Sequence, residues 1–132
     1  MPQPAPPEFF LDRGLGRRVA EGLTERGWIV HRAAEHFPND ASDVSDADWL
    51  KYGLERGWSP MCKDGRIKGR QLERAPLEEH AAVLFYLDNQ QLLVAEMVHR
   101  FHHSQQAIYR AVARRGPRAY AVGAHGIRPT WP

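Results

Sequence analysis

The sequence predicts a single three-layer α/β/α domain, in which helices cover both faces of a mainly parallel central sheet. Two patterns predict this class. The apolar run Phe9–Leu11 ends on Asp12 and a glycine-containing turn, after which apolar residues recur with a helical period from Leu15 onward. A second short strand, Trp28–His31, follows Gly27, and a strand–helix–strand unit of this kind has parallel strands.

The composition is that of an ordinary globular domain. Of the 132 residues, 26% are charged and 42% are hydrophobic, which is enough chain for one core. No apolar run approaches the roughly 20 residues of a membrane span, and residues 1–7 are proline-rich without a signal-peptide pattern. We therefore expect a disordered leader over residues 1–8, a single domain over residues 9–132 and a cytoplasmic location. The single cysteine, Cys62, excludes an internal disulfide and is interpreted as a small buried strand residue.

The segment after the second strand predicts a loop followed by a well-marked helix. Residues 32–44 contain a proline and several acids, which favours a loop or an irregular short helix. Ser45 has the form of a helix N-cap, and Asp48 can reach back to it as the acid of a capping box. Trp49 begins the apolar face of this helix, and Gly57 ends it.

The rest of the chain alternates strands and helices. Asp88 and Asn89 directly follow the most strand-like run and are predicted to cap the helix after it. The remaining predicted elements are a third strand at 58–62, a loop with a short helix at 66–79, a central strand at 81–87, one long helix with an apolar period from Val94 to Val112, and an edge strand at 119–122 with a short extension in the tail.

The charges are unevenly distributed along the chain. Five acids and no lysine or arginine lie between Arg32 and Lys51, whereas the basic residues gather at 63–70 and at 110–118. The formal net charge of +2 permits nucleic-acid binding without requiring it. Three histidines have helical metal-ligand spacing but no accompanying third-ligand motif, so a solvated or partner-facing patch is the preferred interpretation; they are His99, His102 and His103.

Three aspartates are predicted to meet at one edge of the sheet. Asp12 ends the first strand, Asp64 ends the third, and Asp46 opens the helix between the second and third strands. In a parallel sheet these positions share the edge where ligands bind. Clustered carboxylates repel one another and favour a hard cation such as Mg²⁺ or Mn²⁺, which would activate water for phosphodiester hydrolysis. Each aspartate also has a local interpretation, in a turn for Asp12 and Asp64 and in a helix first turn for Asp46.

The motifs around these aspartates resemble those of the PIN-like domain family, especially the VapC-like toxin ribonucleases of toxin–antitoxin pairs. The matching segments are F-F-L-D-R at Asp12, S-D-A-D-W-L at Asp46 and M-C-K-D-G-R-I at Asp64, and the last two aspartates lie 18 residues apart. The resemblance implies a Mg²⁺- or Mn²⁺-dependent endoribonuclease in which these three aspartates are the metal ligands and catalytic residues. It also implies an RNA substrate and a small antitoxin partner, and leaves a homodimer open.

The chain departs from the family pattern in one place. The family usually carries a fourth acid before the helix that opens with aspartate, and no candidate here lies in a clear motif, so one-metal and two-metal chemistry both stay open. The candidates are Glu35, Asp40 and Asp43. Contacts to the RNA backbone are expected from basic residues close to the aspartates in sequence. These residues are Arg13, Lys63, Arg66 and Lys68.

Two alternative functions remain from the sequence. One is a catalytically impaired PIN-fold module that binds nucleic acid or protein, with aspartates that only cap helices and turns. The other is a phospho-acceptor domain similar to response-regulator receivers. Receivers carry a pair of acids after the first strand, whereas Arg13 follows Asp12 here, which argues against that reading.

Overall fold

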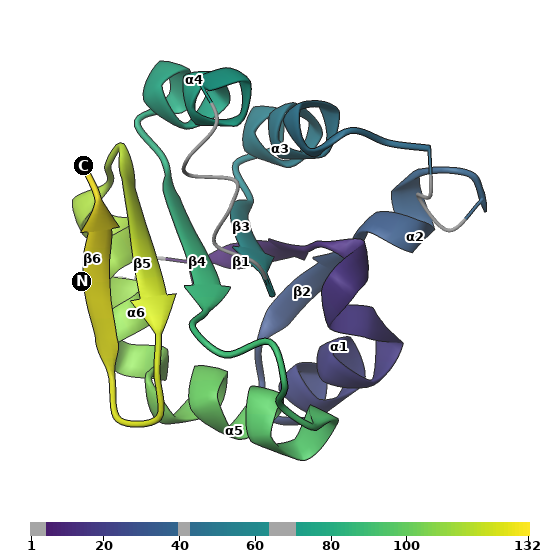
Figure 1. The fold of residues 1–132 in the computed structure, drawn as a ribbon, viewed down its shortest axis with the longest axis vertical. Helices are drawn as coiled ribbons and strands as arrows, with labels where there is room; N and C mark the ends of the chain where they lie inside the picture. The colour runs from purple at the N-terminus through teal and green to yellow at the C-terminus, as the bar shows by residue number, and fades with distance from the viewer. Residues whose placement is uncertain (1–4, 40–42, 64–70) are drawn as a thin grey trace.

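The computed structural model describes residues 5–39, 43–63 and 71–132, and for residues 71–73 the backbone alone. Within these ranges the chain forms one six-stranded sheet in the order β2-β1-β3-β4-β5-β6. Strands β1 to β5 are parallel, and β6 runs antiparallel to β5 (Figure 1). The strands are β1 (Glu8–Leu11), β2 (Ile29–Arg32), β3 (Ser59–Cys62), β4 (Val83–Leu87), β5 (Arg118–Val122) and β6 (Ile127–Trp131).

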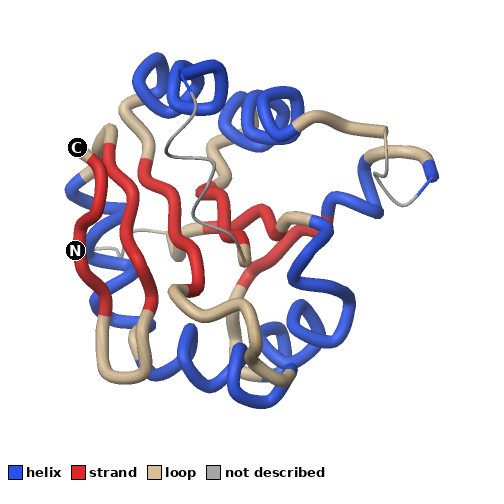
Figure 2. The backbone as a smooth tube through the Cα atoms, viewed as in Figure 1, coloured by secondary structure: helices blue, strands red, loops and turns tan. Residues whose placement is uncertain are grey.

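Helices cover both faces of the sheet, as predicted for a three-layer domain. Helices α1, α5 and α6 lie on one face, and α3 and α4 lie on the other (Figure 1). Figure 2 shows the same layers as red strands between blue helices. The helices are a short 3₁₀ turn η1 (Arg13–Leu15), α1 (Gly16–Glu25), α2 (Ala33–His36), α3 (Asp46–Glu55), α4 (Gln71–His80), α5 (Val94–His103) and α6 (Gln105–Arg114).

The sheet divides the hydrophobic core into two layers. Phe9 and Leu11 pack in the layer under α1, α5 and α6, whereas Phe10 packs in the layer under α3 and α4. This alternation follows from the two-residue period of a strand. All five residues of β4 are buried, as expected of a central strand covered on both faces.

The prediction of one long helix from Val94 to Val112 is wrong, because the structure has two helices there. The chain breaks at Ser104, whose φ of −100° and ψ of 14° lie outside the helical range. Serine is a weaker helix former than the apolar residues around it, so a break at this position costs little helix stability. The break lets α5 and α6 each turn an apolar face toward the same core layer, through Met97 and Ile108 for example.

Two further predictions about the second half of the chain are corrected. Asp88 and Asn89 do not cap α5, because this helix begins only at Val94 and its N-cap residue Leu93 makes no side-chain cap bond. Strand β5 is not an edge strand, because the tail pairs with it as β6 (Figure 1). Among the described residues, no helix is long and apolar enough to cross a membrane.

Candidate active site

The parallel pairing of β1 and β3 places Asp12 at the carboxyl edge of the sheet. The backbone N–H of Asp12 donates to the carbonyl of Met61 at 3.0 Å, which continues the ladder one residue beyond β1. The Oδ1 atom of Asp12 accepts a hydrogen bond from the Leu15 N–H at 3.1 Å and so caps η1. Leu15 is buried, and this cap therefore ties the turn to the core. Asp12 has the turn role that the sequence left open.

Asp46 is the first residue of α3, and the helix start is held as the sequence predicted. The Ser45 Oγ accepts a hydrogen bond from the Asp48 N–H at 3.1 Å. The reciprocal half of the capping box does not form, because the exposed carboxylate of Asp48 makes no hydrogen bond to another described residue. An acid in this first turn interacts favourably with the positive end of the helix dipole.

Asp12 and Asp46 line the same cavity, which has a volume of about 190 Å³. Its lining residues within the described ranges are Asp12, Arg13, Gly14, Ala33, Val44, Asp46 and Trp49. The turn after β1, the segment after β2 and the start of α3 therefore converge at this edge. Two of the three predicted aspartates come together here, and their roles as metal ligands and catalysts stay predictions.

The end of β3 also lies beside this turn. A Cβ atom added to Gly14 would lie 3.3 Å from Asp12 Oδ1 and 3.8 Å from the Cβ of Lys63. Gly14 thus lets the turn pass close to both the aspartate and the residue that follows β3. Lys63 is partly buried at this position, whereas Arg13 is exposed and lines the cavity.

Comparison with known proteins decides the family. A family model described as "PIN like domain" matches residues 7–89, which is more than half of the chain. The chain belongs to the PIN-like domain family. It is also 32% identical over 116 residues to "Putative ribonuclease VapC45" of Mycobacterium tuberculosis, a match that covers 86% of this chain and 84% of the relative. No solved structure matches the chain.

The third predicted aspartate lies inside the PIN-like match but outside the described residues. Asp64 and the predicted RNA contacts Arg66 and Lys68 all fall within residues 64–70. Within the described ranges, no three histidine, cysteine, aspartate or glutamate side chains are grouped so that they could hold a metal ion. A site with three carboxylates would therefore need a residue outside the described ranges, and the predicted ligand Asp64 is such a residue.

The two described candidates for a fourth acid, Glu35 and Asp43, lie outside the lining of the cavity. Glu35 is exposed and lies 4.0 Å from a guanidinium nitrogen of Arg32, outside the cavity lining. Asp43 is also exposed and accepts a 3.4 Å hydrogen bond from the side chain of Asn39. Asp40 lies outside the described residues. Of the described acids, Asp12 and Asp46 alone line the cavity.

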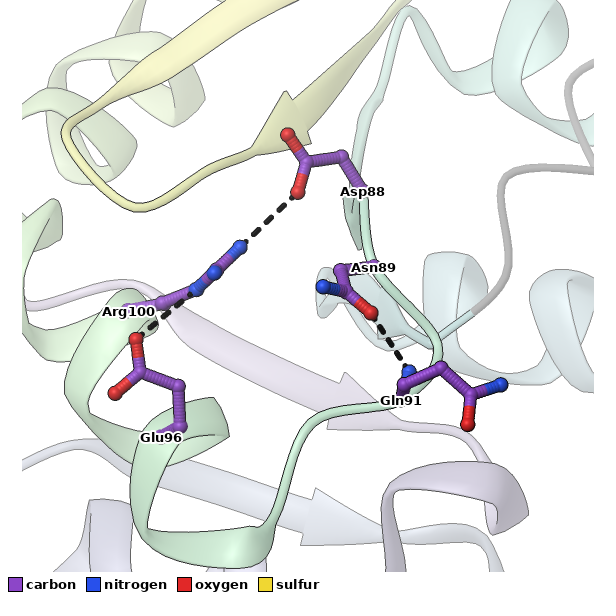
Figure 3. Close-up of polar contacts among 5 residues, drawn as sticks. All are labelled: Asp88, Asn89, Gln91, Glu96 and Arg100. Carbon is purple, nitrogen blue, oxygen red and sulfur yellow. Dashed lines mark hydrogen bonds and ion pairs between the residues drawn. The ribbon is translucent and has the colours of Figure 1, made fainter.

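A carboxylate that the sequence assigned to helix capping has another role in the structure. Asp88 follows β4, and its Oδ1 accepts a hydrogen bond at 3.1 Å from Arg100 of α5 (Figure 3). Arg100 also donates to Glu96 at 3.2 Å, and its own side chain is only 13% exposed. Asn89 Oδ1 accepts from the Gln91 N–H at 2.8 Å and shapes the loop between Asp88 and α5 (Figure 3). The ion pair ties the end of β4 to α5. The position of Asp88 directly after a strand singled out this residue in the sequence, but nothing there indicated Arg100 as its partner.

Proposed function

We propose that this PIN-like domain is a divalent-metal-dependent endoribonuclease and the toxin of a type II toxin–antitoxin pair. The observation that carries the proposal is the pairing of Asp12 and Asp46 in one cavity at the carboxyl edge of the sheet. Two carboxylates in a shared cavity repel one another, and a divalent cation bound to both relieves that repulsion. The ribonuclease name of the mycobacterial relative supports the same reading.

The donors in this cavity fit Mg²⁺ or Mn²⁺, because both aspartates offer only oxygen atoms. Asp12 and Asp46 would hold the ion together with Asp64. The bound cation would supply positive charge to a phosphodiester and lower the pKa of water used for hydrolysis. The chain contributes the placement of the two described carboxylates, which the η1 cap and the α3 start fix.

The size of the cavity favours a phosphodiester group over a whole nucleotide. Pockets that enclose drug-sized ligands measure about 300–1,000 Å³, and this cavity measures about 190 Å³. We infer that the RNA backbone enters while the bases stay outside. Arg13 and Lys63 flank the cavity and would hold neighbouring phosphates, together with Arg66 and Lys68. Binding should then weaken as salt rises.

The partners follow from the same proposal. The substrate is RNA, and a small antitoxin would hold the activity in check in the cytoplasm. An open reading frame for a small protein directly beside this gene would support the pairing.

Cleavage of RNA by purified, antitoxin-free protein tests the proposal. We expect EDTA to stop cleavage and added Mg²⁺ or Mn²⁺ to restore it, and Asp46→Asn to abolish it. Asp48→Asn is the matched control, because Asp48 lies in the same helix turn but is exposed and outside the cavity. Equal activity of wild type and Asp46→Asn would refute the proposed site.

The second candidate function is a catalytically impaired binding module. It is favoured by the fourth-acid candidates Glu35 and Asp43, which lie outside the cavity. In this case the wild-type protein binds RNA or a protein partner with salt-dependent affinity, and no divalent ion produces cleavage.

A further inference from the structure

Helix α5 carries two exposed histidines that the proposed function does not use. His99 and His103 lie four positions apart in this helix, and both side chains are exposed. Residues with this spacing are neighbours on one face of a helix. The opposite face of α5 is buried in the core through Met97, Val98 and Phe101. The two imidazoles therefore extend from the solvent side of a helix that the core holds in place.

The structure brings these two side chains together. Their rings stack with centroids 5.7 Å apart and planes inclined by 27°. Neither ring makes a hydrogen bond to another described residue, whereas the Nδ1 of His102 accepts one from Trp28 Nε1 at 3.1 Å. The sequence alone favoured a solvated patch for the histidines of α5. The contact between the two rings adds that one small ligand can reach both of them.

The spacing and the ring contact fit a metal ion bound by two imidazoles. Two histidines four positions apart are the pair with which the helix of H-E-x-x-H proteins binds zinc. Nitrogen ligands lie about 2.0–2.1 Å from zinc, so two of them on one ion are at most about 4.2 Å apart. Rings with centroids 5.7 Å apart can present nitrogens at that separation, because exposed side chains can change rotamer at little cost.

We propose that His99 and His103 form a binding site for one transition-metal ion of the class that prefers imidazole, with Zn²⁺ as its representative. Two ligands on one rigid helix act as a chelate, because binding of the first places the second at a high effective concentration. His103 is the last residue of α5, where the free carbonyl groups of the helix end favour a cation. Two protein ligands leave positions on a tetrahedral ion for water or another molecule.

The charged groups beside the pair are compatible with a bound cation. Arg100 follows His99 in the sequence, but its guanidinium donates to Asp88 at 3.1 Å and to Glu96 at 3.2 Å (Figure 3). These two carboxylates offset its charge and so reduce its repulsion of a cation on the histidines. Within the described ranges, no third histidine, cysteine or acid is grouped with the pair as a ligand.

This site differs in place and in chemistry from the cavity of Asp12 and Asp46. Neither histidine lines that cavity. Mg²⁺ prefers oxygen ligands, whereas imidazole nitrogens favour Zn²⁺, Cu²⁺ and Ni²⁺. The inference therefore goes beyond the proposed function and does not depend on it.

Titration with Zn²⁺ by calorimetry, in excess Mg²⁺, tests the proposal. We expect His99→Gln and His103→Gln each to weaken Zn²⁺ binding at least about 10-fold, because either one leaves a single imidazole and removes the chelate. The matched control is His125→Gln, which removes another exposed histidine, in the turn between β5 and β6. It should leave the affinity unchanged. Equal Zn²⁺ affinities for wild type, His99→Gln and His103→Gln would overturn the inference.

Nuclear magnetic resonance of the imidazole ring protons shows where the ion binds. With assignments from the single variants, the His99 and His103 resonances should move together over the same range of Zn²⁺ concentration, and His125 should stay fixed. Stationary His99 and His103 resonances contradict the site. Asp46→Asn should bind Zn²⁺ as wild type does. Loss of Zn²⁺ binding in Asp46→Asn, with binding kept in the two histidine variants, would place the ion in the carboxylate cavity and refute the inference while leaving the nuclease proposal intact.

Discussion

Two substitutions of Asp12 separate its structural role from its proposed chemical role. The Asp12 carboxylate accepts the Leu15 N–H at 3.1 Å and also lines the cavity with Asp46. Asp12→Asn keeps an acceptor oxygen at the same position but removes the charge, whereas Asp12→Ala removes both. Both variants relieve the same repulsion from Asp46. The difference in unfolding free energy between them therefore measures what the acceptor oxygens of the side chain contribute, the cap on η1 included.

The loss of the cap determines how far the unfolding free energy should fall. Losing an N-cap acceptor costs about 0.5–2 kcal/mol. With a urea m-value of about 2 kcal/mol/M, Asp12→Ala should unfold at a midpoint about 0.3–1 M below that of Asp12→Asn. Mg²⁺ should stabilise the wild type, by about 2.7 kcal/mol at a hundred times its Kd. It should stabilise neither variant, and both variants should be inactive on RNA.

Urea unfolding with and without Mg²⁺ measures the stability of each variant and the effect of the metal, and an RNA cleavage assay measures the activity. Equal midpoints for the two variants would show that the 3.1 Å cap contributes nothing to stability. A Mg²⁺-dependent shift in Asp12→Asn as large as that in wild type would refute Asp12 as a metal ligand.

Three further predictions concern the surroundings of the site. Ser45→Ala should destabilise the protein by about 0.5–2 kcal/mol in urea unfolding, whereas Asp48→Ala should cost less because its carboxylate makes no cap bond. Gly53→Ala should cost about 1–3 kcal/mol, since the added Cβ would lie 2.5 Å from the buried ring of Phe10, and an unchanged midpoint would contradict this packing. Burial first, and neighbouring charge second, lower the pKa of His36 below its ordinary 6.5, so its neutral form stabilises the fold above that pH. Unfolding free energy should fall as the pH drops below 6.5 through the lowered pKa, and His36→Phe should flatten this dependence.

The order of strands and helices could be predicted because each element carries its own local signal. The burial of Phe9, Phe10 and Leu11 follows from a strand between two helical layers, and the start of α3 follows from Ser45. The prediction failed where local signals were compatible with two outcomes. The apolar period continues through Ser104, so only the packing of α5 and α6 determines that the helix breaks there.

The candidate site also has features that the sequence predicts and features that it does not. The meeting of Asp12 and Asp46 could be predicted, since parallel strands bring their carboxyl ends to one edge. The ion pair of Asp88 with Arg100 joins residues 12 positions apart, and the strand-end aspartate gave no sign of its partner. The burial of the Trp49 indole nitrogen, which makes no hydrogen bond to a described residue, is less predictable still. It depends on what surrounds the side chain in three dimensions, and in the sequence Trp49 is indistinguishable from any other apolar helix residue.

Asp12 and Asp48 show why a local role and a functional role are not alternatives for an aspartate. A carboxylate can accept about four hydrogen bonds, so capping one N–H uses a small part of its capacity and fixes its orientation. The cap on η1 thus holds Asp12 beside Asp46 in the cavity, and the turn interpretation supports the site interpretation. Asp48 has neither role, because its carboxylate makes no cap bond and lies outside the lining of the cavity. Position at the edge of the sheet, and not the absence of a structural role, distinguishes a candidate metal ligand in this domain.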